Sequence, residues 1–378
     1  MIHESNVKQV YLVGDLHLGV KGNSLVWSEI QEDYLLKTFT RQLLQRTHII
    51  NESILILEGD IFHSRQSIDV RVFDRALTIF KHLSSLFRTV YIILGNHDVY
   101  YKEDNSLNSV GILAKLFPNI KVFENPEVLK VNNEYKFLLL PWVESVEKIT
   151  EIIEDHSGKC QYIICHADIQ NASLNSFSKM DKGIDLNVLK TYKRIYSGHI
   201  HLRQEIKKYG ASVSYTGTPY SMDKNDVGNQ KGFDILSFVE GEIVETFVPN
   251  DESPIFVKKN LYTILEMNVA EIEALIKNNF VEIQVDTKIA NRFSIQVFMD
   301  LIKDMGHRKI EFSNYTVTQK MDAKAIAQNA VDASIDLSIP NMMNMYLDQK
   351  GYDRVMRKRI ERKFETFMNK VKEQQKTD

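Results

Sequence analysis

Five short segments of the chain each place a metal-binding type of side chain directly after an apolar run. These side chains are carboxylates, imidazoles and one amide, which offer only oxygen and nitrogen donors to a metal ion. Two divalent metals held by such donors form a hydrolytic site for phosphate esters. The residues are Asp15 and His17, Asp60, Asn96, His166, and His199 with His201.

The segments that precede these residues have the composition of strands buried on both faces, since most of their positions are β-branched, aromatic or leucine. A single loop cannot surround two cations, whereas several strands that end at one edge of a sheet can each supply one or two ligands. We therefore expect one sheet edge to gather the ligands, after strands at residues 10–13, 54–57, 90–94, 162–165 and 193–196.

The five motifs resemble those of the calcineurin-like metallophosphoesterases. Within that family the chain is similar to the SbcD-type nucleases of double-strand-break repair, and most similar to the nuclease subunits of tailed-phage recombination. The resemblance covers residues 8–250 and is weaker beyond them. The segments that carry it are 95–102, 140–142 (Leu-Pro-Trp), 191–193, 197–201 and 215–220, with Lys231-Gly232-Phe233 as a further mark of the nuclease branch.

The resemblance implies an α/β fold, a two-layered β-sandwich flanked by helices, with a small α/β cap domain and C-terminal helices. It divides the chain into a nuclease domain at 1–250, a DNA-gripping cap at 255–320 and a helical ATPase-binding segment at 335–378. Residues 249–254, which contain two prolines, are typical of a linker.

Apolar periodicity predicts further elements. Helices are expected at 69–87 and 107–117, and in related nucleases these two helices build a homodimer. In the cap, strands are expected at 261–269, 281–285 and 309–317, and helices at 270–278 and 293–305.

The resemblance also assigns roles within the site. A hydroxide between two divalent ions, Mn²⁺ being favoured and Mg²⁺ the alternative, would attack the phosphodiester. His97 would not be a ligand but would assist the leaving oxygen. The ligands would divide into Asp15, His17 and His201 for one metal and Asn96, His166 and His199 for the other, with Asp60 bridging both.

Two residues are candidates for orienting His97. Many family members carry an aspartate three residues after the bridging aspartate, and here that position is His63. Asp98 is the second candidate, and its alternative role is that of an ordinary turn residue. We count both with His97 as predicted catalytic residues.

The composition is that of an ordinary globular protein: 378 residues, 43% hydrophobic and 26% charged. The two cysteines, Cys160 and Cys165, lie in one strand-like stretch and are expected to pack as free thiols, which suits a reducing compartment. No apolar run has the length of a membrane span, and the first residues lack the apolar core of a signal peptide. We expect a cytoplasmic protein, or one of the host cytoplasm if a phage encodes it.

The charge of the chain is unevenly distributed. The net charge is −3, yet residues 350–378 contain ten lysines and arginines against five aspartates and glutamates. The same segment carries an apolar stripe at helical spacing, which predicts a helix that packs on a partner or on its own domain. The resemblance favours the partner, an SMC-like coiled-coil ATPase. Because the chain has no phosphate-binding Gly-x-x-x-x-Gly-Lys-Ser/Thr loop, ATP dependence would come from that second polypeptide.

Three functions agree with these features. The first is a two-metal DNA exonuclease and endonuclease that acts on double-stranded ends and single strands in recombination and repair. The alternative is a stand-alone phosphodiesterase for small or cyclic nucleotides, which would need neither cap nor terminal helices. The third is an inactive scaffold, which the presence of all seven candidate ligands disfavours.

Deletion of the residues after 335 is expected to leave metal-dependent cleavage intact and to abolish ATPase binding, because the predicted docking helix would be lost. Pull-down of the ATPase by the truncated and full-length chains measures this. Equal recovery of the ATPase by both chains would contradict the prediction.

Overall fold

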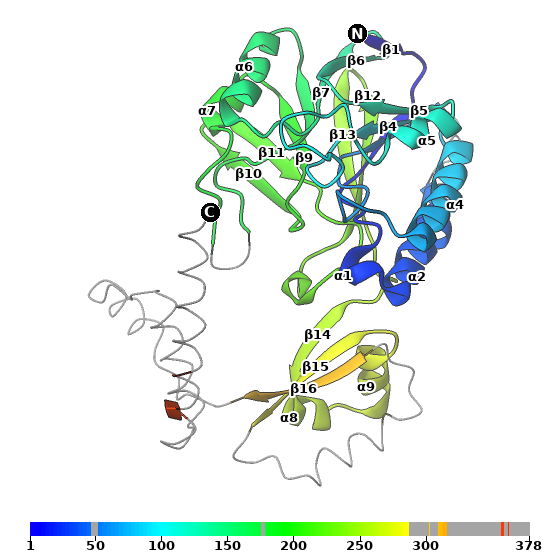
Figure 1. Ribbon diagram of the computed structural model, residues 1–378, viewed down its shortest axis with the longest axis vertical. Coiled ribbons are helices and arrows are strands. Elements are labelled where there is room, and N and C mark those ends of the chain that lie inside the picture. The colour runs from blue at the N-terminus through cyan, green and yellow to red at the C-terminus, as the bar shows by residue number, and fades with distance from the viewer. Residues whose placement is uncertain are drawn as a thin grey trace. The chain divides into compact units, whose positions relative to one another are not determined.

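The computed structural model describes residues 1–46, 52–174, 178–286 and 309–315, together with positions 302, 357, 358 and 362. Two mixed β-sheets form the main body, and a small sheet follows them in the chain (Figure 1). The seven-stranded sheet has the order β1 (Ile2–Glu4), β6 (Glu127–Val131), β7 (Tyr135–Leu140), β8 (Tyr162–His166), β9 (Arg194–Gly198), β11 (Ala211–Tyr215) and β10 (Gln204–Lys208). The six-stranded sheet has the order β13 (Glu242–Pro249), β12 (Gly232–Val239), β2 (Gln9–Val13), β3 (Ile54–Leu57), β4 (Thr89–Ile93) and β5 (Ile120–Phe123).

The central strands are mostly apolar because both of their faces are buried. In β2, Val10 and Leu12 belong to the core between the two sheets, whereas Tyr11 and Val13 belong to a core beneath helices. Helices cover the outer faces of both sheets (Figure 1). They are α2 (Leu25–Asp33) and α4 (Val70–Leu86) on one side and α6 (Val146–His156) and α7 (Leu186–Leu189) on the other. The predicted α/β sandwich flanked by helices is confirmed.

The five strands predicted to precede the ligands are present as β2, β3, β4, β8 and β9. The expectation that they end at one edge of a single sheet is wrong. Three of them lie in the six-stranded sheet and two in the seven-stranded sheet. The candidate ligands therefore come from two stacked sheets, which lets them approach one centre from both sides.

The helix predicted at 69–87 is confirmed as α4, whose first turn is capped by the Asp69 side chain accepting from the Arg71 backbone N–H. The helix predicted at 107–117 is shorter, because α5 spans only Gly111–Leu116. The residues before it pair with the loop that follows β4, since the Tyr100 N–H donates to the Leu107 carbonyl.

The third sheet is parallel and consists of β14 (Phe256–Asn260), β15 (Phe280–Asp286) and β16 (Lys309–Tyr315). The strand predicted at 261–269 is wrong: α8 (Leu261–Leu265) occupies that segment, and Asn268 caps α9 (Val269–Ile276). Leu261 and Ile264 are both buried, and their spacing of three fits a helix face. The predictions that correspond to α9, β15 and β16 are confirmed. Apart from single positions, the helix predicted at 293–305 and the segment 335–378 lie outside the described residues.

The predicted linker at 249–254 is fixed by hydrogen bonds to the main body. The Asn250 side chain donates to the Pro219 carbonyl, and its backbone N–H donates to the Lys231 carbonyl. Trp27 of α2 stacks on Phe280 of β15 with 5.0 Å between ring centroids. Residues Met1–Tyr315 accordingly group into one compact unit, and the three-domain division stays a prediction. No helix in the described ranges has the length and apolar character needed to cross a bilayer.

Candidate metal centre

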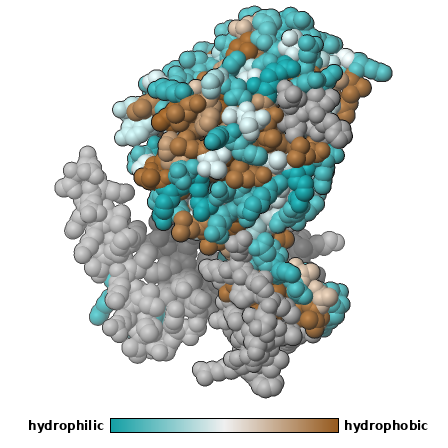
Figure 2. Space-filling model, turned by 90° about the vertical axis from the view of Figure 1, so that its right-hand side faces the viewer, coloured by the Kyte–Doolittle hydropathy of each residue, from teal (hydrophilic) through white to brown (hydrophobic). Residues whose placement is uncertain are grey.

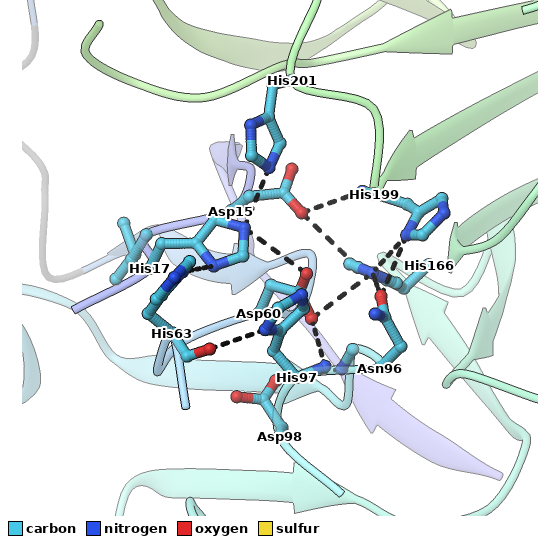
Figure 3. A network of polar contacts seen from close by, with 12 residues as sticks. Asp15, His17, Asp60, His63, Asn96, His97, Asp98, His166, His199 and His201 are labelled. Carbon is cyan, nitrogen blue, oxygen red and sulfur yellow. Dashed lines mark hydrogen bonds and ion pairs between the residues drawn. The ribbon is translucent and has the colours of Figure 1, made fainter. Parts of the chain in front are cut away.

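All ten residues predicted for the site lie together where the two sheets end (Figure 3). Loops of the six-stranded sheet bring seven of them, and β8 with the loop after β9 brings the other three. The first group comprises Asp15 and His17 after β2, Asp60 and His63 after β3, and Asn96, His97 and Asp98 after β4. The second group comprises His166, His199 and His201.

The loops bend sharply at the ligands themselves. His17, Asp60 and His199 have φ angles of 46°, 52° and 86°, a left-handed conformation that non-glycine residues rarely adopt. Gly95 lets the loops approach each other, because a Cβ there would lie 2.2 Å from Asp60 Oδ1. Such strained backbone is concentrated at functional sites, where the surrounding structure holds it in place.

The Asp60 carboxylate lies between two sets of donor atoms. Its Oδ2 is 3.5 Å from His17 Nε2, and that nitrogen is 2.9 Å from His201 Nε2. Its Oδ1 is 3.5 Å from His166 Nε2 on the other side. One oxygen of Asp60 thus faces each set, as a carboxylate that bridges two cations requires.

The second set is completed by an amide oxygen. Asn96 Oδ1 lies 3.0 Å from His166 Nε2 and 2.9 Å from His199 Nδ1. The three atoms therefore surround a common point. Asp60, His166 and His199 offer ligand atoms within 4.8 Å of one another, and so do Asp15, His17 and Asp60.

Hydrogen bonds from the far side of each ring orient two of these histidines. His166 Nδ1 lies 2.7 Å from the Glu58 carbonyl, to which it donates, so that Nε2 keeps its lone pair for the centre. His199 Nε2 lies 2.7 Å from Asp168 Oδ1, which leaves Nδ1 facing Asn96. Sequence reasoning missed Asp168, although it follows His166 by only two residues.

The electrostatics of the site favour a bound cation. Burial, above all, lowers the pKa of His17 and brings that of His166 to about 3, so both rings are neutral and carry free lone pairs. Burial, followed by the charge of Asp15, raises the pKa of Asp60 well above its usual range. Among the described residues, Asp15 Oδ2 is buried without a hydrogen-bond partner. Two close carboxylates and neutral imidazoles fit divalent metals that accept oxygen and nitrogen ligands.

His97 is oriented by a backbone group. His97 Nδ1 donates to the His63 carbonyl oxygen at 2.6 Å, and the two rings stack with 5.5 Å between centroids. The His63 ring contacts His17 at 3.4 Å between their Nδ1 atoms. Together the three rings form a further group of ligand atoms within 4.8 Å, so His63 and His97 also lie within reach of a metal.

Asp98 is turned away from His97 and toward the backbone of two loops. Its buried carboxylate accepts the N–H groups of Ile61, Phe62 and Gly95 at 2.9, 3.3 and 3.0 Å. Burial raises its pKa to about 7. These bonds connect the loop of Asp60 to the loop of His97. Asp98 is therefore a positioning residue.

Trp142 is a second residue that sequence reasoning did not place in the site. Its ring lies 5.2 Å from the ring of His199 and 6.0 Å from that of His166, measured between centroids. The signal was the Leu-Pro-Trp segment that begins at the last residue of β7, which the sequence offered only as a family mark. Trp142 forms an apolar wall beside the second set of donors.

Replacement of Asp168 by alanine is expected to weaken metal binding by about 10- to 100-fold, because the ring of His199 loses the partner that orients it. A Mn²⁺ titration followed by electron paramagnetic resonance measures the affinity. Asp155→Ala, at an exposed position of α6, is the matched control. An unchanged Mn²⁺ affinity in Asp168→Ala would contradict the prediction.

Asp98→Ala is expected to destabilise the protein by about 1–3 kcal/mol, because the buried N–H groups of Ile61, Phe62 and Gly95 lose their acceptor. Urea unfolding measures the change. Asp104→Ala is the control, because exposed Asp104 makes its similar bonds to Ser106 in contact with water. An unchanged free energy of unfolding in Asp98→Ala would contradict the prediction.

Comparisons with known proteins identify relatives of the chain. The chain is 30% identical over 241 residues to "Exonuclease subunit 1" of Enterobacteria phage T4, covering 63% of this chain and 67% of that protein. It is 21% identical over 384 residues to "Uncharacterized protein R555" of Acanthamoeba polyphaga mimivirus, covering 93% of this chain and 25% of that protein.

Among solved structures, a single mutant of Vps29 from Entamoeba histolytica is 14% identical with a TM-score of 0.28, over 64% of this chain and 99% of that one. The phosphopantetheinyl hydrolase of Mycobacterium tuberculosis is 13% identical with a TM-score of 0.31, over 57% and 91%. TM-scores this low support no conclusion about function. The profile of the calcineurin-like phosphoesterases, in contrast, matches residues 8–224, more than half of the chain. The chain therefore belongs to the calcineurin-like phosphoesterase family.

Proposed function

We propose that the chain is the nuclease subunit of a DNA recombination and repair complex, a two-metal exonuclease and endonuclease. The observation that carries the proposal is the position of Asp60, with one carboxylate oxygen toward each of two donor sets. The family match supports phosphoester hydrolysis. The similarity to a phage protein named as an exonuclease subunit supports DNA as the substrate.

The seven ligands would act as two groups that share one residue. When bound, two divalent ions, Mn²⁺ by preference and Mg²⁺ as the alternative, supply Lewis-acid chemistry that activates water and stabilises charge on the phosphate. Asp60 would neutralise part of the charge of both ions. Asp15, His17 and His201 would hold one ion, and Asn96, His166 and His199 the other.

His97 would act on the oxygen that leaves the phosphorus. Its Nδ1 is held by the His63 carbonyl, so its Nε2 is the atom left to face a substrate. Its backbone N–H donates to Asp60 Oδ1 at 2.8 Å, which couples the position of His97 to that of the shared ligand. A ring in this position can donate a proton to the leaving oxygen or stabilise its negative charge. His63 and Asp98 would position His97 and its loop.

The partners follow from the same proposal. The phage relative is named as a subunit, and this sequence has no phosphate-binding loop, so an SMC-like ATPase would join it through residues 335–378. A homodimer would form through α4 and α5, which expose Val70, Ile112 and Leu116. Figure 2 faces the side where α4 lies in Figure 1 and shows apolar patches between polar ones there.

Purified protein with Mn²⁺ is expected to degrade end-labelled linear duplex DNA. Asp60→Ala is expected to abolish cleavage, because both donor sets lose their shared ligand. His97→Ala is expected to lower kcat by about 10²- to 10⁴-fold while metal binding is retained, since its proposed contribution is proton transfer. Gel analysis of the label, beside a Mn²⁺ titration of each variant, measures both effects.

The substrate of the assay separates the two candidate functions. Metal-loaded wild type that leaves DNA intact, with and without the ATPase partner, but hydrolyses small phosphodiesters would overturn the nuclease proposal. It would favour a stand-alone phosphodiesterase. Lys277→Ala, an exposed change in the segment between α9 and β15, controls for nonspecific effects of substitution.

A further inference from the structure

A buried lysine lies directly behind the candidate metal centre. Lys231 is only 5% exposed, and its ammonium group donates to three acceptors. They are the His201 carbonyl at 2.9 Å, Thr218 Oγ1 at 2.8 Å and Asp226 Oδ1 at 2.6 Å. An ammonium group has three protons, so each is used once and none is left without a partner.

The acceptors join the turn at 216–219 to the loop that carries His201. Gly217 has a φ of 74°, and a Cβ there would lie 2.9 Å from the His201 carbonyl oxygen. On the other side of this turn, a Cβ on Gly14 would lie 2.4 Å from the Gly217 carbonyl oxygen. The turn is therefore packed between the loop of Asp15 and the loop of His201, and Lys231 holds it there.

The residues after this turn are bound to the His17 loop as well. Tyr220, which is fully buried, donates its hydroxyl to the Leu16 carbonyl at 2.5 Å. Asp226 in turn accepts the N–H groups of Met222 and Asp223 through its second oxygen. Lys231 thus closes a network that contacts the loop of Asp15 and His17 and binds the loop after β9 directly at His201, while the Thr216 N–H donates to the Ser197 carbonyl of β9.

The second donor set is fixed by other means. His166 is held by the Glu58 carbonyl and His199 by Asp168, and neither bond involves Lys231 or its acceptors. We propose that Lys231 is a positioning residue for one metal only, the ion that Asp15, His17 and His201 would share. The proposal rests on the two-metal function proposed above. It adds that a different group of residues positions the ligands of each ion.

An ammonium group suits this position better than the alternatives. Its three donors point in tetrahedral directions, toward a carbonyl, a hydroxyl and a carboxylate on separate segments. The planar guanidinium of arginine cannot reproduce that arrangement, and a neutral side chain would leave Asp226 charged and unpaired in the interior. This geometry explains in physical terms why a lysine occupies the first position of the segment Lys231-Gly232-Phe233.

The test compares Mn²⁺ binding by wild type, Lys231→Arg and the double variant Lys231→Met/Asp226→Asn, which leaves no unpaired buried charge. Wild type is expected to bind two Mn²⁺ ions and to give the spin-coupled resonance signal of a pair. Each variant is expected to keep one tight Mn²⁺ ion and to bind the other about 10- to 100-fold more weakly, with an uncoupled signal at low occupancy. Thermal unfolding of the same samples shows that the chains are folded.

Glu4→Gln is the control, because Glu4 accepts hydrogen bonds from Thr89 and Tyr91 in a part-buried network on β1 and β4. It is expected to leave both Mn²⁺ affinities unchanged. If the double variant does not fold, Thr218→Val removes one acceptor at constant shape and is expected to show the same selective loss. Equal weakening of both ions, or no weakening of either, would overturn the assignment of Lys231.

These readouts need no DNA. A wild type that binds two Mn²⁺ ions but cuts no DNA, with and without the ATPase partner, would therefore refute the nuclease function. The metal titration would still decide the role of Lys231. A wild type with one Mn²⁺ ion would refute both proposals together.

Discussion

The structure depends on the presence of two carboxylates, Asp15 and Asp60, in a buried space beside neutral histidine rings. Burial opposes ionisation of Asp60, and the charge of Asp15 opposes it further. A cation relieves both effects, because it attracts the carboxylates and takes the lone pairs of the rings. Metal binding is then coupled to folding, since an ion that binds the folded chain in preference to the unfolded chain stabilises it by mass action.

The fold meets this requirement by bringing loops from two sheets to one place. Parallel strands of the six-stranded sheet supply Asp15, Asp60 and Asn96 from neighbouring positions, and the other sheet supplies His166 and His199 from across the sandwich. Hydrogen bonds between the loops then fix the loops relative to one another. Asp60 accepts from the His97 backbone, and the His199 backbone N–H donates to Asp15 at 2.9 Å. The carboxylates of Asp60 and Asp15 are thus both candidate ligands and anchors for a neighbouring loop.

The sequence was sufficient to predict the five strands that precede the ligands, because a buried strand and the polar residue after it are local features. It did not reveal that these strands divide between two sheets. It was insufficient for contacts that exist only in three dimensions. The sequence does not reveal that Asp168 faces His199 or that Lys231 reaches His201. Backbone acceptors are equally hidden: the position of His63 suggested an orienting side chain, and the orienting group is its carbonyl oxygen.

The errors in the third sheet have a similar origin. Strand β14 (Phe256–Asn260) contains two lysines and an asparagine, so it lacks the apolar run by which the other strands were predicted. Helix α8 (Leu261–Leu265) spans only five residues, too few to show a helical period clearly. Burial of Leu261 and Ile264 against β15 favours a helix over a strand in this segment. That burial depends on the tertiary fold.

The chain has two tryptophans, and their surroundings make them separate optical reporters. Trp142 packs against the rings of His166 and His199, so its fluorescence will respond to any ion that binds there. Trp27 lies in an aromatic stack with Phe256 and Phe280 of the third sheet, and its emission will change when that stack opens. Single replacement of either tryptophan by phenylalanine separates the two signals. Occupancy of the centre and attachment of the third sheet can then be followed in real time without any added label.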